Sequence, residues 1–275
     1  MRNSRGQGVD GSRGRKKQAE KGSPQEPYEL KSFRADLHIH TCLSPCAELE
    51  MSPSAIVARA LQLGIDIIAI TDHNSAENVH AAVRAARNTP LIVLGGMEIT
   101  TSEEAHILAL FDDMESLLKL QGIVYDNLLP GENDEKRFGE QIVVNEEDEV
   151  LGFNKRLLIA SVELSVYSLL NMIHSLGGLC IASHVDKEVF SIISQLGFIP
   201  DNLKFNALEM SPHIGKDAAG ERFPSYKSCP WISSSDAHHL VDIGKRTSVF
   251  SMHEPTLADI LSALNHFEEG RVEWG

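Results

Sequence analysis

The chain has 275 residues, 42% of them hydrophobic, so it is long enough to form one large core. No apolar run approaches the ~18 residues that a membrane span needs, and no signal-peptide core follows the N-terminus. We therefore expect a cytoplasmic protein with four reduced cysteines and no membrane partner. The net charge is −14, which argues against non-specific binding to long duplex nucleic acid.

The N-terminal segment differs in charge from the rest of the chain. Residues 1–32 carry eight Lys and Arg against four Asp and Glu, so the remainder carries about −18. Because this segment is rich in Gly, Ser, Arg and Lys and almost lacks apolar residues, it predicts a disordered basic tail. The folded domain is then expected over residues 33–275.

From residue 33 onward, apolar strand-like runs alternate with amphipathic helices. The helices are expected after Ser52-Pro53 up to Gly64, and over residues 76–87, 165–176, 187–195 and 256–268. Alternation of strand and helix predicts an α/β fold with a largely parallel sheet. A βα barrel of this kind would present side chains at the carboxyl ends of its strands.

Residues 112–164 interrupt the alternation. A short polar helix is expected at 113–120, and two runs, 141–145 and 149–153, flank the acidic turn at 146–148. These runs predict a hairpin inserted into the main fold. The insertion is either a lid or partner surface, or a solvated decoration.

His38 and His40 stand one residue apart at the end of the first strand-like run. On a strand, this spacing points both imidazoles to the same face, where they can bind a divalent metal. Further apolar runs also carry metal-ligating residue types, mostly at their ends: Asp72 and His73, Glu98, His106, His184, Glu209, and Asp236 with His238. The repetition predicts a metal centre where the strands end.

In this order, the motifs resemble those of the polymerase-and-histidinol-phosphatase (PHP) family of metal-dependent phosphoesterases. The resemblance covers residues 33–112 and 165–270. It implies a distorted (β/α)7 barrel with two or three divalent ions (Mn, Zn, Fe or Mg) at the strand ends, and Glu98 as a bridging carboxylate. The ligands it implies are His38, His40, His73, Glu98, His106, His184, Asp236 and His238.

One position departs from the family pattern. Many members have Asp or His a few residues after the paired histidines, whereas this chain has Pro45 where a frequent Asp would fall. Glu48 or Cys46 could reach back to the site, and Glu48 is the preferred ligand because a carboxylate suits hard metal ions better than a thiolate. The alternatives are a solvated loop position for Glu48 and simple packing for Cys46.

Other residues are candidates for roles beside the metals. Asp72 is assigned as catalytic, either as a base or through an outer-sphere contact, with a purely structural role as the alternative. Asp36 could orient an imidazole. Arg246 is the preferred phosphate-binding cation because guanidinium fits phosphate bidentately, and Lys187, Lys216 and His213 are the alternatives.

The function expected from these residues is hydrolysis of a phosphate ester, a small phosphomonoester or nucleotide, by metal-activated water. No serine-nucleophile or P-loop motif offers another route. An exonuclease on short oligonucleotides is the enzymatic alternative, and a metal-binding regulatory module without turnover is the non-enzymatic one. The sequence does not determine the substrate or the oligomeric state.

Overall fold

The structure is a computed structural model that describes residues 29–275. The predicted basic tail therefore lies almost entirely outside the described residues. Strand β1 (Lys31–Ile39) begins with Lys31 opposite Met252 of β10 (Ser248–Met252), in antiparallel pairing. The first strand of the described residues thus begins at Lys31, slightly before the predicted boundary at residue 33.

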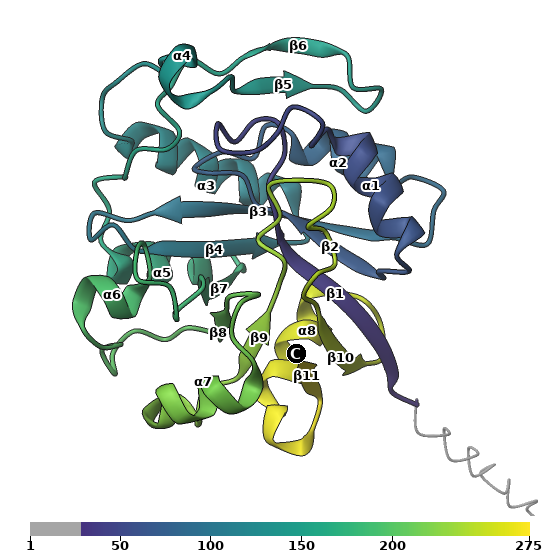
Figure 1. Cartoon of the computed structure of the whole chain (residues 1–275), viewed down its shortest axis with the longest axis vertical. Coiled ribbons are helices and arrows are strands. Elements are labelled where there is room, and N and C mark those ends of the chain that lie inside the picture. The colour runs from purple at the N-terminus through teal and green to yellow at the C-terminus, as the bar shows by residue number, and fades with distance from the viewer. Residues whose placement is uncertain (1–28) are drawn as a thin grey trace, which may run out of the picture.

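A mixed sheet of nine strands forms the centre of the described chain, in the order β11-β10-β1-β2-β3-β4-β7-β8-β9 (Figure 1). The seven further strands are β2 (Ile67–Ile70), β3 (Ile92–Thr100), β4 (His106–Phe111), β7 (Leu179–Ala182), β8 (Ala207–Met210), β9 (Trp231–Ser233) and β11 (Val272–Trp274). The two edges of the sheet approach each other, because the rings of Trp231 and Trp274 lie 6.3 Å apart. The expected distorted barrel is confirmed, with nine strands in place of seven.

The sheet is less parallel than expected. Strands β1, β2 and β3 run parallel, as do β7, β8 and β9, but β4 is antiparallel to both of its neighbours. The reason is local: a short turn over residues 101–105 joins β3 to β4, which leaves no room for a crossover helix. The start of β4 therefore lies beside the end of β3, with Thr100 opposite His106.

Helices cover the sheet, and none in the described residues is long and apolar enough to cross a membrane. They are α1 (Pro53–Gln62), α2 (Val79–Ala85), α3 (Met114–Asn127), α4 (Glu135–Phe138), α5 (Val166–Ser175), α6 (Ile192–Leu196), α7 (Lys216–Arg222) and α8 (Leu257–Asn265), with 3-10 turns at Pro224–Tyr226 and Phe267–Glu269. Helices α1, α5 and α8 lie where the sequence predicts them. Helix α7 was not predicted from the sequence. The helix expected at 113–120 is present as α3, but α3 extends to Asn127.

Two predicted helices begin later than expected. Helix α2 starts at Val79 because the polar residues before it, which could have capped an earlier start, have other partners: Ser75 Oγ bonds Tyr125 Oη at 2.7 Å, and the Asn74 side chain donates to the insertion. Helix α6 starts at Ile192, where Ser191 caps the amide of Ser194. As a result, residues 71–78 between β2 and α2, and residues 183–191 between β7 and α6, are not helical and follow directly on the ends of these strands.

The inserted hairpin is present as β5 (Ile142–Val144) and β6 (Val150–Phe153), which form a separate antiparallel pair above the sheet (Figure 1). Asn78 fastens it to the main fold, since its side chain donates to the Ile142 carbonyl at 3.0 Å and accepts from the Val144 amide at 3.0 Å. The hairpin is therefore hydrogen-bonded to the segment that leads into α2.

Candidate metal centre

Eight side chains meet at the edge of the sheet where most of the parallel strands end. The residues are His38 in β1, His40 directly after β1, His73 after β2, Glu98 in β3, His106 at the start of β4, His184 after β7, and Asp236 and His238 after β9. His106 joins them because β4 runs in the opposite direction, so its first residue lies beside the end of β3. The structure therefore brings together all eight ligands that the resemblance implies.

Glu98 is at the centre of this cluster. Five imidazoles surround a carboxylate that is only 1% exposed. Its Oε1 lies 3.1 Å from His106 Nδ1 and His184 Nε2 and 3.3 Å from His38 Nε2, and its Oε2 lies 3.4 Å from His40 Nε2 and His73 Nδ1. Each oxygen thus has its own group of nitrogen neighbours, the arrangement expected of a bridging carboxylate.

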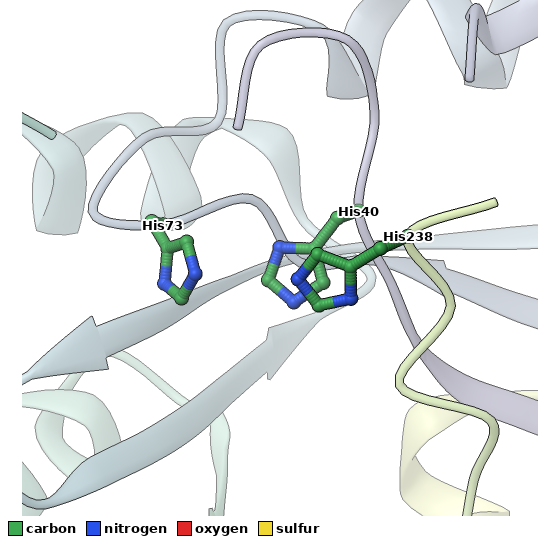
Figure 2. A group of neighbouring side chains, drawn as sticks. All are labelled: His40, His73 and His238. Carbon is green, nitrogen blue, oxygen red and sulfur yellow. The ribbon is translucent and has the colours of Figure 1, made fainter. Parts of the chain in front are cut away.

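Three overlapping triads of ligating atoms occur among residues 29–275, each with its atoms within 4.8 Å of one another. They are His38-His40-Glu98, His73-Glu98-His106 and His40-His73-His238. Figure 2 shows the all-histidine triad, in which His40 and His238 lie nearly face to face with ring centroids 4.3 Å apart. Shared members between triads fit a cluster of ions better than a single one.

Unpartnered nitrogen atoms show that the residues fit divalent metals. The Nδ1 atoms of His73 and His106 are buried and face Glu98 at 3.4 and 3.1 Å, but neither has the geometry of a hydrogen bond. A buried imidazole nitrogen without a partner is costly unless a ligand accepts its lone pair. Imidazole and carboxylate together form the donor set of zinc, manganese and iron sites.

The charges of the cluster are strongly coupled. Burial disfavours charge on all of these groups, but the imidazoles of His106 and His38 hold the pKa of Glu98 well below its ordinary value. The carboxylates of Glu209, Glu98 and Asp236 overcome burial and hold the pKa of His38 well above its ordinary value. The carboxylates therefore create a negative potential that favours cations at this place.

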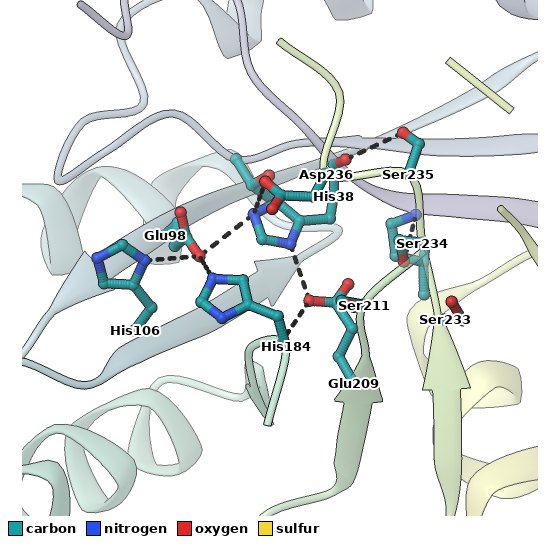
Figure 3. Close-up of polar contacts among 12 residues, drawn as sticks. His38, Glu98, His106, His184, Glu209, Ser211, Ser233, Ser234, Ser235 and Asp236 are labelled. Atoms are coloured by element: carbon teal, nitrogen blue, oxygen red, sulfur yellow. Dashed lines mark hydrogen bonds and ion pairs between the residues drawn. The ribbon is translucent and has the colours of Figure 1, made fainter. Parts of the chain in front are cut away.

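Outer contacts orient the paired histidines. Glu209 Oε2 lies 2.9 Å from His38 Nδ1, and Ser44 Oγ lies 3.0 Å from His40 Nδ1, so the Nε2 atoms of both rings face the cluster (Figure 3 for His38). Such partners fix the tautomer and direction of a ligating imidazole. The sequence signal for Glu209 is an acidic residue inside the apolar β8 run, but its orienting role was not predicted; nor was that of Ser44.

Asp72 lies behind the ligands and outside the cavity that they line. Its carboxylate accepts from the Thr41 amide at 2.7 Å, the Thr41 hydroxyl at 2.8 Å and the Ser44 hydroxyl at 2.7 Å. It therefore holds Ser44 against His40, which matches the outer-contact reading and gives a base no route to substrate. Asp36 does not orient an imidazole; its oxygens accept from the amides of Ser235 and Gly244.

Glu48 and Cys46 are placed differently from the expectation. The Glu48 side chain is 57% exposed and faces His239, with Oε1 3.7 Å from Nδ1, so the structure does not bring it into the cluster. Cys46 lines a cavity of about 230 Å³ together with His73, His106 and His238. The Glu48 amide donates to the carbonyl of His238 at 3.0 Å, so the loop backbone lies beside the cluster while the Glu48 side chain stays outside it.

Arg246 lines a second cavity, of about 720 Å³, beside the ligands Asp236 and His238. Its Nε donates to the carbonyl of Pro212 at 3.0 Å, which directs the guanidinium along this cavity. The other basic residues there are Lys187, His213, His239 and Lys245. Lys187 is bonded to Asp236 at 2.5 Å, whereas the candidate Lys216 lies elsewhere, over the Trp274 ring.

Several strained backbone conformations occur at the metal cluster. Four non-glycine residues at the cluster or its rim have positive φ: Asn74 (49°), His184 (29°), Phe190 (57°) and Asp236 (51°). Such conformations cost ~1–3 kcal/mol each and persist where the surrounding structure enforces them. The strain places His184 and Asp236 at angles that a regular strand would not allow.

Comparison with known proteins agrees with this geometry. A 5'-3' exoribonuclease of Haemophilus influenzae is 33% identical over 94 residues, which is 31% of the chain and 33% of that relative. The lesion-specific endonuclease Q of Pyrococcus furiosus has the same fold, with a TM-score of 0.66 and 16% identity, over 86% of the chain and 56% of that protein. A complex of endonuclease Q with a 27-mer duplex containing an abasic lesion matches with a TM-score of 0.66 and 17% identity, over 86% and 57%.

A two-domain protein of Bacteroides vulgatus, described as containing a predicted PHP-like metal-dependent phosphoesterase, matches with a TM-score of 0.55 and 16% identity, over 91% of the chain and 67% of that protein. The PHP domain matches residues 36–210, and the PHP-associated region matches residues 220–267. The first match alone covers more than half of the chain and contains six of the eight clustered ligands. The chain therefore belongs to the PHP family of metal-dependent phosphoesterases.

Proposed function

We propose that this protein hydrolyses a phosphate ester of a nucleotide or small molecule with two or three divalent ions held by the eight clustered ligands. The observation that carries the proposal is the position of Glu98, whose two oxygens face separate sets of imidazoles within three overlapping triads. In such a site, divalent ions activate water and neutralise charge on the phosphate oxygens. Manganese, zinc, iron and magnesium are the candidates.

The protein's own side chains would orient the ligands and the substrate. Glu209 and Ser44 hold His38 and His40 in the direction of the cluster, and Asp72 acts through Ser44. Arg246 is the proposed contact for a phosphate oxygen, because a guanidinium beside the ligands can bind two oxygens at once. Lys187 would keep Asp236 ionised and in place, since their ion pair is mostly shielded from solvent.

A nuclease activity is the second candidate, and the 720 Å³ cavity supports it. This cavity starts at Asp236 and His238 and is lined by Arg246 and His213, while Lys245 is paired with Asp242 of the same lining. A phosphate beyond the scissile one would therefore meet the Arg246 guanidinium. The similarity to an exoribonuclease, and to an endonuclease bound to a duplex, adds support. The overall acidic charge therefore does not exclude duplex substrates, and the test includes them.

A panel of substrates with metal-reconstituted protein tests the proposal. We expect turnover of phosphomonoesters, short single-stranded RNA or DNA, or a duplex after loading with manganese or zinc, and none after chelation. Glu98→Gln should lose both turnover and bound metal, while Glu221→Gln, an exposed change on α7, should lose neither. Two or more bound ions without turnover of any substrate would favour the regulatory module instead.

A further inference from the structure

The metal-side cavity has an apolar rim. Ile159, Val189 and Phe190 line the 230 Å³ cavity together with the ligands His73 and His106. The three apolar side chains are 40%, 59% and 43% exposed. Exposed apolar groups clustered at the mouth of a polar site commonly mark a surface for the organic part of a ligand.

Phe190 is held directly against a metal ligand. Its carbonyl accepts from the His106 amide at 2.8 Å, and its ring stacks on the His106 ring with centroids 4.7 Å apart and planes 13° apart. The backbone is in the left-handed region, with φ of 57°, which has a cost for a bulky residue. One ring face is thus covered by His106, and the exposed remainder of the ring borders the cavity.

Ile159 reaches the rim because the residue after His73 holds the insertion. The Asn74 side chain donates to the carbonyls of Leu158 and Ala160, at 2.8 and 2.7 Å, on either side of Ile159. Asn74 is itself fixed, since its amide donates to the Glu98 carbonyl at 2.9 Å. The insertion is therefore fastened to the metal centre, and one of its apolar residues forms a wall of the cavity.

We propose that Ile159, Val189 and Phe190 form a binding subsite for the base of a nucleoside phosphate whose phosphate group lies at the metal ligands. The proposal rests on the proposed function. A planar base gains from stacking on an aromatic ring and from burial against aliphatic side chains, whereas a polyol phosphate gains little from either. The Arg246 guanidinium lines the other cavity, so the apolar wall and this positive charge occupy separate places for base and phosphate.

The test compares two phosphomonoesters with the metal-loaded full chain. Adenosine 5'-monophosphate carries a base, and glycerol 3-phosphate does not. We expect Phe190→Leu to lower kcat/KM for the nucleotide by about tenfold, mainly through KM, which is within the range for loss of base stacking. The value for glycerol phosphate should change by less than about twofold by the same reasoning. Phe190→Trp should retain the preference because it keeps a flat ring.

Matched controls separate this role from a structural one. Phe198→Leu alters a phenylalanine that is 58% exposed and lines a different cavity, so it should leave the substrate preference unchanged. Metal content is measured for each variant, because Phe190 also packs on His106. An equal loss for both substrates, or no change for either, would overturn the subsite.

Equilibrium binding distinguishes failure of the subsite from failure of the proposed function. If the wild-type protein turns over neither ester, titration with adenosine 5'-monophosphate and with inorganic phosphate replaces kinetics. Weaker nucleotide binding by Phe190→Leu with unchanged phosphate binding would support the subsite even though the phosphatase assignment had failed. Equal affinities of wild type and Phe190→Leu for the nucleotide would overturn it.

Discussion

The two ends of the barrel each carry a cavity, but only one of them carries chemistry. At the metal end, the 230 Å³ cavity is lined by buried imidazoles and carboxylates, and two imidazole Nδ1 atoms around it have no hydrogen-bond partner. At the opposite end, residues that precede β8 and β9 line a larger cavity of about 550 Å³ with Phe198, Phe205, Tyr226 and Cys229. The 550 Å³ cavity is larger than the 230 Å³ cavity, but the 720 Å³ cavity beside Asp236 and His238 is larger than both.

The two ends of the barrel differ in whether their buried polar atoms have hydrogen-bond partners. At the opposite end, Tyr226 Oη accepts from the Ile199 amide at 3.0 Å, and the Tyr226 carbonyl accepts from Trp231 Nε1 at 3.0 Å. None of the unpartnered buried side-chain atoms found between residues 29 and 275 belongs to that lining. At the metal end, buried polar atoms that lack hydrogen-bond partners indicate that a ligand is required.

The largest expected effect comes from the centre of the metal cluster. Glu98→Gln keeps the shape of the side chain but removes the charge that five imidazoles surround. Turnover should fall by more than ~100-fold, beyond what substitution of an outer contact causes, and bound metal should fall with it. Steady-state kinetics and elemental analysis measure both. Phe198→Ala, in the 550 Å³ cavity at the opposite end, serves as the comparison and should leave metal content unchanged.

A smaller effect is expected from an outer contact. Glu209→Gln weakens the hold on His38 Nδ1, so metal affinity should fall by ~10- to 100-fold and excess metal should restore much of the rate. Titration of the apo-protein with zinc or manganese measures this affinity. A rate that excess metal cannot restore would show that Glu209 contributes more than orientation.

One cysteine lines each of these two cavities, so the reactivity of their thiols can be compared. Cys46 lines the 230 Å³ metal cavity, and Cys229 lines the 550 Å³ cavity at the opposite end. Desolvation by surrounding protein and the carboxylates of Glu98, Asp236 and Asp72 raise the pKa of Cys46 to about 12, although the residue is exposed. Burial raises the pKa of Cys229 to about 11. Both thiols should therefore react slowly near neutral pH.

Alkylation with a maleimide should lower turnover in proportion to the labelling of Cys46, because the adduct would occupy the mouth of the metal cavity. Cys46→Ser should protect the enzyme and Cys229→Ser should not. Inactivation that persists in Cys46→Ser would assign the sensitivity to another residue.

The smallest effect is expected at Glu48. Because its side chain is 57% exposed and faces His239, Glu48→Gln should change the free energy of unfolding by less than ~1 kcal/mol, as for other exposed ion pairs. Metal affinity should stay the same. A clear loss of one bound ion would restore Glu48 as a ligand and show that the loop after His40 closes when metal binds.

Much of the site could be predicted from residue patterns. Period-two spacing places His38 and His40 on one face of a strand, and an apolar run that ends in a ligating residue repeats at His73, His184 and Asp236. The antiparallel direction of β4 was harder to predict, since only the short turn after β3 indicates it. The roles of Ser44 and Asn74 depend on partners 28 to 86 residues away, which no local pattern reveals.

The sequence by itself determined the alternation of strands and helices, the eight clustered ligand types and the family to which they belong. It could do so because these features rest on local periodicity and on residue chemistry. Only the tertiary structure decided which imidazoles face each oxygen of Glu98 and that the Glu48 side chain stays outside the cluster. The tertiary structure also decided that Ile159 of the insertion lines the metal cavity. These outcomes depend on hydrogen bonds between distant segments, such as that from Asn74 to the Leu158 carbonyl, and such bonds form only when the chain has folded.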